Sequence, residues 1–320
     1  MARPANPLPR NLPDVFTVRS ALSLGASEDR LRARDLDRSI RGVRMPVDAT
    51  LTMRLDAAFL AVPSAFACGP TAAHIHGLPL PFRVAPGAGA IDIAIAGPGR
   101  AVRRRRFRAR SLRVRPGDVV VVGRIPTLSV ERAWCDLTRW CSVPELVAGA
   151  DHAIRMRLTT LPRLVEAVDR LPDQRGTAKL RAALELVDPA SESPKESETR
   201  ALVVLAGLPT PRVNVTIHDE RGLFVARVDQ FFEDFGEVLE YQGDHHRTDQ
   251  RQWRRDRTRE SELESLGLHV TEVTEADLRR PVELVERVAR NLARRGWRGE
   301  IRLSRWFPRT PPVALQRRSP

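Results

Sequence analysis

The chain has 320 residues, a net charge of +13 at neutral pH and an isoelectric point near 11.1. Its length exceeds one average domain, and its 42% hydrophobic content can form buried cores, which excludes a wholly disordered protein. The sequence contains no apolar run of the roughly 18 residues that cross a membrane, and its first residues lack the apolar stretch of a secretory signal. We therefore expect a cytoplasmic protein with no membrane partner.

The basic charge indicates a polyanionic partner, and we expect DNA. Part of the arginine excess is also typical of a high-GC coding bias, so charge alone does not establish this partner. The sequence contains three cysteines, which are too few and too irregularly spaced for a disulfide framework.

The N-terminal segment predicts a small DNA-binding module behind a Pro-rich arm at 1–14. Within 15–48, Thr17 and Ser27 can each cap a short helix, and "SIRGVRMP" predicts a small hairpin. This order resembles the N-terminal winged helix of AbiEi-type antitoxins, although a generic capping module fits the same elements. The resemblance implies that Arg41 and Arg44 of the wing contact DNA.

Residues 51–185 predict a mixed α/β middle domain, in which "AIDIAIAG" alternates as a strand does. Cys68, His74 and His76 lack the paired spacing of a zinc site, so we expect no metal there. The arginines at 103–106 either follow a phosphate backbone or form a solvated edge strand.

A polar hinge at 188–199 opens the last predicted domain, 193–298, and we expect a flexible tail at 303–320. Helix, strand and turn signals give the order α-β-β-β-α-β-α, so the predicted fold class of the chain is mixed α/β. This order places Asp229 near the end of one strand and Glu240 in its hairpin neighbour. Two carboxylates that face the same way can share one divalent cation, and Gln242 lies on the same face as Glu240.

The stretches "SPKESETR", "ARVDQFF", "LEYQGDHHRTDQRQWRRDRTRE" and "LGLHVTEVT" give this domain a specific resemblance. It is similar to the endonuclease-like domain related to very-short-patch repair nucleases, of the PD-(D/E)xK superfamily, which follows an AbiEi-type winged helix in actinobacterial proteins. The resemblance implies a restriction-endonuclease-like αβββαβα fold. It also implies the following roles: Asp229 and Glu240 as metal ligands; Glu196, Gln242 and His246 as further catalytic residues; Arg251, Arg254, Arg255 and Arg259 as DNA contacts; Arg200 and Asp256 as supporting residues.

The resemblance thus implies a deoxyribonuclease, a hydrolase of phosphodiester bonds that uses Mg²⁺ or Mn²⁺. Gln242 stands where the superfamily carries lysine, and an amide can orient water but cannot supply a positive charge. His246 is then the candidate general base. The alternative is a degenerate nuclease fold that serves as a non-catalytic DNA-binding regulator of AbiEi type, with a toxin as partner.

Overall fold

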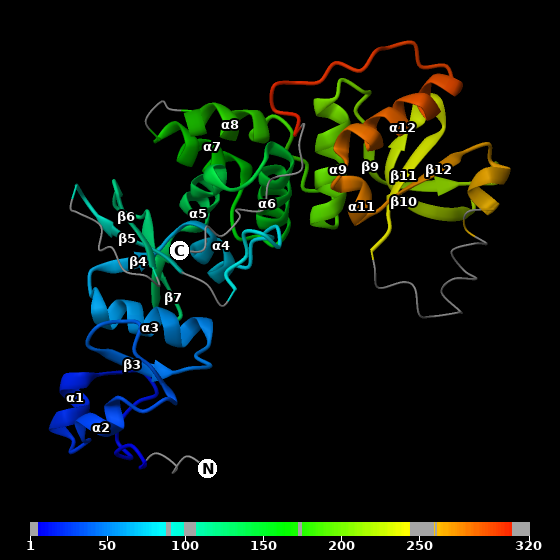
Figure 1. Cartoon of the computed structure of the whole chain (residues 1–320). Coiled ribbons are helices and arrows are strands. Elements are labelled where there is room, and N and C mark those ends of the chain that lie inside the picture. The colour runs from blue at the N-terminus through cyan, green and yellow to red at the C-terminus, as the bar shows by residue number, and fades with distance from the viewer. Residues whose placement is uncertain are drawn as a thin grey trace. The chain divides into compact units, whose positions relative to one another are not determined.

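A computed structural model describes residues 6–87, 91–98, 107–171, 175–243, 259 and 261–308 (Figure 1). The chain forms a mixed α/β fold and divides into two compact units, Met1–Leu137 and Thr138–Pro320. The predicted middle domain, 51–185, contributes residues to both units. Among the described helices, none is long and apolar enough to cross a membrane.

The first unit begins with a small three-stranded sheet in the order β1-β3-β2. Thr17 caps the first helix by accepting a hydrogen bond from Ser20 N at 3.1 Å, and Ser27 caps the second by accepting one from Arg30 N at 3.2 Å, as predicted. Phe16 and Leu31, the last residue of the second helix, are buried in one small core. The elements are β1 (Phe16–Thr17), α1 (Val18–Ser23), α2 (Glu28–Leu31), β2 (Leu36–Asp37) and β3 (Val43–Pro46).

The same unit continues with a five-stranded sheet in the order β6-β5-β4-β8-β7. Its core is mainly aliphatic with Phe66 and Phe107, and Ile91 and Ile93 of the predicted alternating strand are buried within it. Cys68 and Cys135 of this unit are buried free thiols, as is Cys141 of the second unit. The elements are α3 (Leu51–Ala61), β4 (Ala65–Ala67), α4 (Gly69–Ile75), β5 (Ile91–Ala96), β6 (Phe107–Leu112), β7 (Val119–Val122), β8 (Ile125–Leu128) and α5 (Val130–Asp136).

The second unit opens with a helical layer that packs on α9. Asp151 of α6 and Arg200 of α9 form a buried ion pair with 2.8 Å between Asp151 Oδ2 and Arg200 Nη2. The two side chains are only 1% and 5% exposed, so this pair is an internal contact of the unit. The elements are η1 (Leu137–Arg139), α6 (Val143–Arg155), α7 (Leu161–Asp169), α8 (Arg175–Leu184) and α9 (Pro194–Leu205).

A four-stranded sheet in the order β12-β11-β10-β9 completes the second unit. The strand pairs are antiparallel except β11 with β12, which are parallel. Residues 261–265 are helical, so the described elements follow the predicted order. The amphipathic helix α12 buries Leu284, Val288 and Leu292, and α9 contacts both α12 and the strands β10 and β11 (Figure 1). The elements are β9 (Arg212–His218), β10 (Phe224–Phe232), η2 (Glu233–Phe235), β11 (Glu237–Tyr241), β12 (His269–Val273), α11 (Glu275–Leu278) and α12 (Pro281–Arg294).

The segment after α12 lies against the C-terminal end of α9. Arg302 N donates a hydrogen bond to Ala206 O, and Ser304 N donates one to Leu205 O, each at 2.8 Å. Phe307 is buried at 4% exposure. The start of the predicted tail is therefore packed, while residues 309–320 lie outside the described part of the chain.

Candidate functional site

Asp229 and Glu240 lie on the neighbouring antiparallel strands β10 and β11. The register pairs Gln230 with Leu239, and continuing it by one residue places Asp229 across from Glu240. Residues directly opposite in an antiparallel pair project from the same face of the sheet. Tyr241 N donates a hydrogen bond to Asp229 Oδ2 at 2.9 Å, which fixes one carboxylate oxygen beside the neighbouring strand. Continued in this way, the register puts the two carboxylates on one face of the sheet.

The environment of Asp229 is poor in water and rich in negative charge. Burial and, after it, the charge of Glu196 raise the pKa of Asp229, while the Tyr241 N–H and the Arg259 guanidinium lower it, and the net result is a pKa of about 6. A carboxylate in such surroundings is stabilised by any cation that comes next to it.

Glu196 is held in place by its own helix terminus. It lies in the first turn of α9 and is 7% exposed, and its Oε2 accepts a hydrogen bond from Glu192 N at 2.8 Å. Its backbone carbonyl accepts a hydrogen bond from Gln230 Nε2 at 2.9 Å, which ties α9 to β10. Glu196 thus adds negative charge near Asp229 from a fixed position.

Arg259 binds Glu240 directly. Its Nη2 lies 2.5 Å from Glu240 Oε1 and also donates to the backbone carbonyl of Arg227 on β10. The Glu240 side chain is 15% exposed and that of Arg259 is 35% exposed. Arg259, predicted to contact DNA, is therefore a counter-ion of the acidic face in this structure.

Gln242 bonds to a residue that the sequence does not single out. Its Nε2 donates to Glu272 Oε1 at 3.1 Å, and its backbone N donates to Val273 O at 2.8 Å. Glu272 is the register partner of Glu240 across the parallel pair β11–β12. A third carboxylate thus continues the row of Asp229 and Glu240. The acidic position in "LHVTEVT" is visible in the sequence, but the register of a parallel pair is not.

The remaining predicted residues either lie away from Asp229 and Glu240 or fall outside the described part of the chain. Arg200 binds Asp151 and the carbonyl of Leu186, although it shares a helix with Glu196. Arg44 donates to the carbonyls of Leu31 and Val43, each at 2.8 Å, and burial lowers its pKa. Arg41 is exposed. The predicted residues that lie outside the described part of the chain are His246, Arg251, Arg254, Arg255 and Asp256, together with the arginines at 103–106.

The donor set of this face suits one metal chemistry better than others. Among the described residues, no three His, Cys, Asp or Glu side chains are grouped as a metal cage. Mg²⁺ is usually bound by one or two carboxylates with water and substrate oxygens rather than by such a cage. Asp229 and Glu240 supply two carboxylates on one face, so these residues fit Mg²⁺ or Mn²⁺.

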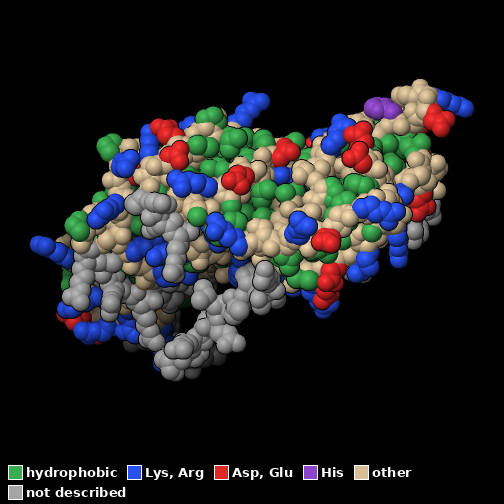
Figure 2. All heavy atoms as spheres, turned by 90° about the horizontal axis from the view of Figure 1, so that it is seen from above, with side chains coloured by type: hydrophobic (Ala, Val, Ile, Leu, Met, Phe, Trp, Pro, Cys, Tyr) green, Lys and Arg blue, Asp and Glu red, His purple; other side chains and the backbone are tan. Residues whose placement is uncertain are grey.

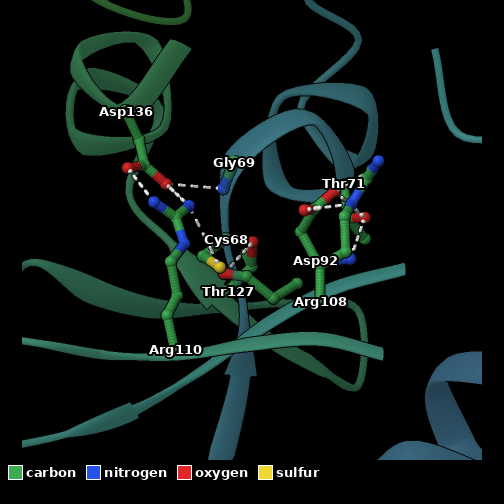
Figure 3. Close-up of polar contacts among 9 residues, drawn as sticks. Cys68, Gly69, Thr71, Asp92, Arg108, Arg110, Thr127 and Asp136 are labelled. Carbon is green, nitrogen blue, oxygen red and sulfur yellow. Dashed lines mark hydrogen bonds and ion pairs between the residues drawn. The ribbon is translucent and has the colours of Figure 1, made fainter. Parts of the chain in front are cut away.

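The first unit contains a second polar cluster, in which two arginines of β6 reach separate carboxylates (Figure 3). Arg108 binds Asp92, which is 1% exposed, at 2.7 Å. Arg110 binds Asp136, whose Oδ2 also accepts a hydrogen bond from Gly69 N at 2.7 Å. Each carboxylate in the cluster is matched by an arginine, which is the arrangement of a structural network.

Cys68, beside Arg110 in this cluster, is not a reactive thiol. Arg110 Nη2 donates to its sulfur at 3.3 Å (Figure 3), but burial raises the pKa of Cys68 to about 12. Because the thiolate is the nucleophilic form, this cysteine does not carry nucleophilic chemistry near neutral pH.

Basic side chains do not gather into one continuous patch on the face that Figure 2 shows. Lys and Arg there are interspersed with Asp, Glu and apolar side chains. On this face the net charge is therefore spread, and it does not by itself mark a nucleic-acid interface.

Comparison with known proteins finds similarity in sequence over about half of the chain. No family model matches the chain. Two uncharacterized proteins of Mycobacterium tuberculosis, MT2308 and Rv2248, are each 31% identical over 177 residues, or 54% of this chain, and the match spans 64% of their own length. A crystal structure of the Rv2827c protein of M. tuberculosis aligns with a TM-score of 0.38 and 14% identity, over 67% of this chain and 87% of that one.

Proposed function

We propose that the second unit is a metal-dependent deoxyribonuclease that hydrolyses phosphodiester bonds at Asp229 and Glu240. The observation that supports this proposal is the β10–β11 register, which, continued by one residue past Gln230 and Leu239, brings the two carboxylates opposite each other. The fixed carboxylate oxygen of Asp229 adds to it, because the Tyr241 N–H sets the direction of that side chain.

A bound Mg²⁺ or Mn²⁺ would polarise the scissile phosphate and lower the pKa of the attacking water. The residues of the chain would bind the cation and orient the groups around it. Asp229 and Glu240 hold the cation, and Glu196 maintains the negative potential that attracts it. Gln242 is held by Glu272, so its amide orients neighbouring groups and supplies no charge to the reaction.

The test is cleavage of supercoiled plasmid DNA by the purified chain in Mg²⁺ or Mn²⁺. Asp229→Asn and Glu240→Gln should each abolish nicking and leave DNA affinity equal or slightly higher, because a negative charge near the phosphates is removed. Glu233→Gln alters an exposed carboxylate of the same unit, which pairs with Arg212, and should nick DNA like the wild type. Equal nicking by all variants would show that the activity arises elsewhere.

A non-catalytic DNA-binding regulator is the second candidate. The pairing of Glu240 with Arg259 favours it, since a neutralised ligand is expected in a site that no longer binds metal. Binding of DNA without cleavage in either metal would select this function, and a toxin encoded nearby would then be the partner to examine.

A further inference from the structure

Arg259 is a cation that contacts the proposed metal ligand Glu240 in this structure. One guanidinium nitrogen, Nη2, contacts both the Glu240 carboxylate at 2.5 Å and the carbonyl of Arg227 on the adjacent strand. The contact bridges β11 at Glu240 and β10 at Arg227, two residues before Asp229. Its charge also acts on Asp229, where it partly offsets the rise in the pKa of that carboxyl group. The guanidinium thus occupies the electrostatic position that a divalent cation would take.

The lone pair of Glu240 Oε1 that accepts from the guanidinium at 2.5 Å cannot bind a metal ion as well. Charge-assisted hydrogen bonds are among the stronger polar contacts, so releasing one has a measurable cost. Arg259 is also the more exposed partner, at 35% against 15% for Glu240, and a long side chain with solvent access can move away without disturbing the core.

We propose that Arg259 is an exchangeable counter-ion: it holds Glu240 before metal binds, leaves when the metal arrives, and then binds a phosphate of the DNA. This inference rests on the proposed function. Guanidinium groups bind phosphate oxygens in the same bidentate manner as carboxylate oxygens, so the released side chain has a suitable second ligand. Arg259 thereby joins metal binding to substrate binding, and acts as a positioning residue for the reaction.

The first experiment measures Mn²⁺ affinity by calorimetry, without DNA, on the full chain. Arg259→Gln should bind Mn²⁺ roughly tenfold more tightly, because the competing charged hydrogen bond is gone. Arg259→Lys, which keeps the charge, should lie between the two. Arg212→Gln is the matched control: it removes the same charge from an ion pair between β9 and Glu233 of η2, and it should leave Mn²⁺ affinity unchanged.

The second experiment measures DNA affinity at several salt concentrations, with Ca²⁺ held constant and the duplex checked for integrity. Each phosphate contact contributes about 0.9 to the log–log slope on duplex DNA. The slope of Arg259→Gln should therefore be shallower than that of the wild type by about this amount. An equal slope would overturn the role of Arg259 at the phosphate.

The outcomes separate this inference from the proposed function. If Glu240→Gln abolishes Mn²⁺ binding but Arg259→Gln leaves it unchanged or weaker, Arg259 does not compete and the inference fails while the metal site stands. If neither the wild type nor Arg259→Gln binds Mn²⁺, both proposals fail. Binding by Arg259→Gln alone would support the exchange, with Arg259 as the dominant competitor. Circular dichroism of each variant establishes that it is folded.

Discussion

The surroundings of the Asp229 carboxyl group favour its neutral, protonated form. Its pKa is raised from 3.8 to about 6, mainly by burial and then by the charge of Glu196. A carboxyl group whose pKa is higher in the folded than in the unfolded state stabilises the fold fully below its unfolded pKa, and this contribution is lost as pH rises through the folded value. At neutral pH, Asp229 therefore reduces stability in the absence of a cation.

Asp229→Asn should consequently stabilise the metal-free protein in a pH-dependent way. We expect a gain of about 3 kcal/mol in the free energy of unfolding at pH 8, because the pKa of Asp229 rises from 3.8 to about 6 and one pKa unit corresponds to about 1.4 kcal/mol. The gain should shrink through pH 6 and vanish near pH 4, where wild-type Asp229 is protonated. Urea denaturation at these pH values measures it.

The control for this prediction is Asp234→Asn, which alters an exposed carboxylate in η2. A similar gain in that variant would mean that the effect comes from net charge and not from the surroundings of Asp229. A loss of stability in Asp229→Asn at pH 8 would show that the carboxylate has a stabilising partner in the metal-free fold.

At the level of elements, Gly207 joins the end of α9 to the packed segment 302–307. Its φ of +80° lies in the left-handed region, and a Cβ there would meet Arg302 N at 3.2 Å and Arg302 O at 3.3 Å. Gly222, in the β9–β10 turn, has nearly the same φ of +78°, but no atom lies within 4 Å of its Cβ position. The two glycines differ in packing and not in backbone conformation.

Gly207→Ala should therefore destabilise the protein more than Gly222→Ala does. The left-handed conformation costs about 1 kcal/mol in both variants. Gly207→Ala should lose about 1–2 kcal/mol more, because the backbone of Arg302 has to shift. Thermal denaturation of the two variants measures the difference. Equal melting temperatures would mean that the segment 302–307 can move away from the added Cβ without loss of stability.

Local patterns predict the elements of the second unit well, because its strands alternate and its helices carry caps. The same patterns place Asp229 and Glu240 on paired strands, since a hairpin brings neighbours in sequence together. They do not find Glu272, because the parallel pairing of β11 and β12 joins segments about thirty residues apart without a tight turn. Nor do they find the pairing of Arg200 with Asp151, because this contact depends on how α6 and α9 pack against each other.

At the level of the whole molecule, the boundary between the two compact units differs from the domain boundary that the composition suggests. The polar hinge at 188–199 suggests a domain that begins near 193, yet the compact unit begins at Thr138 and includes α6. Composition marks a solvated turn, whereas unit boundaries depend on which helices cover which apolar faces. The helix α9 is buried along most of its length, including Ala201 and Leu202, and α6 packs on it.

A fragment of residues 138–308 should therefore fold, and one of residues 188–308 should be much less stable. Without α6, the shorter fragment exposes apolar surface of α9 and loses the partner of Arg200. We expect a deficit of at least about 3 kcal/mol, since removal of a buried ion-pair partner alone costs about that much. Equal melting temperatures of the two fragments would show that the domain begins at the hinge.

The burial of all three cysteines also makes the chain suitable for site-specific labelling. Burial raises the pKa of both Cys68 and Cys135 to about 12, so these thiols react slowly near neutral pH. Leu223 in the β9–β10 turn is 62% exposed, and Leu223→Cys would supply a fast-reacting thiol on an otherwise native sequence. A nitroxide attached there lies about 20 Å along β10 from Asp229, at about 3.3 Å per residue. Its relaxation would then report directly on Mn²⁺ bound at the carboxylates, independently of any cleavage of DNA.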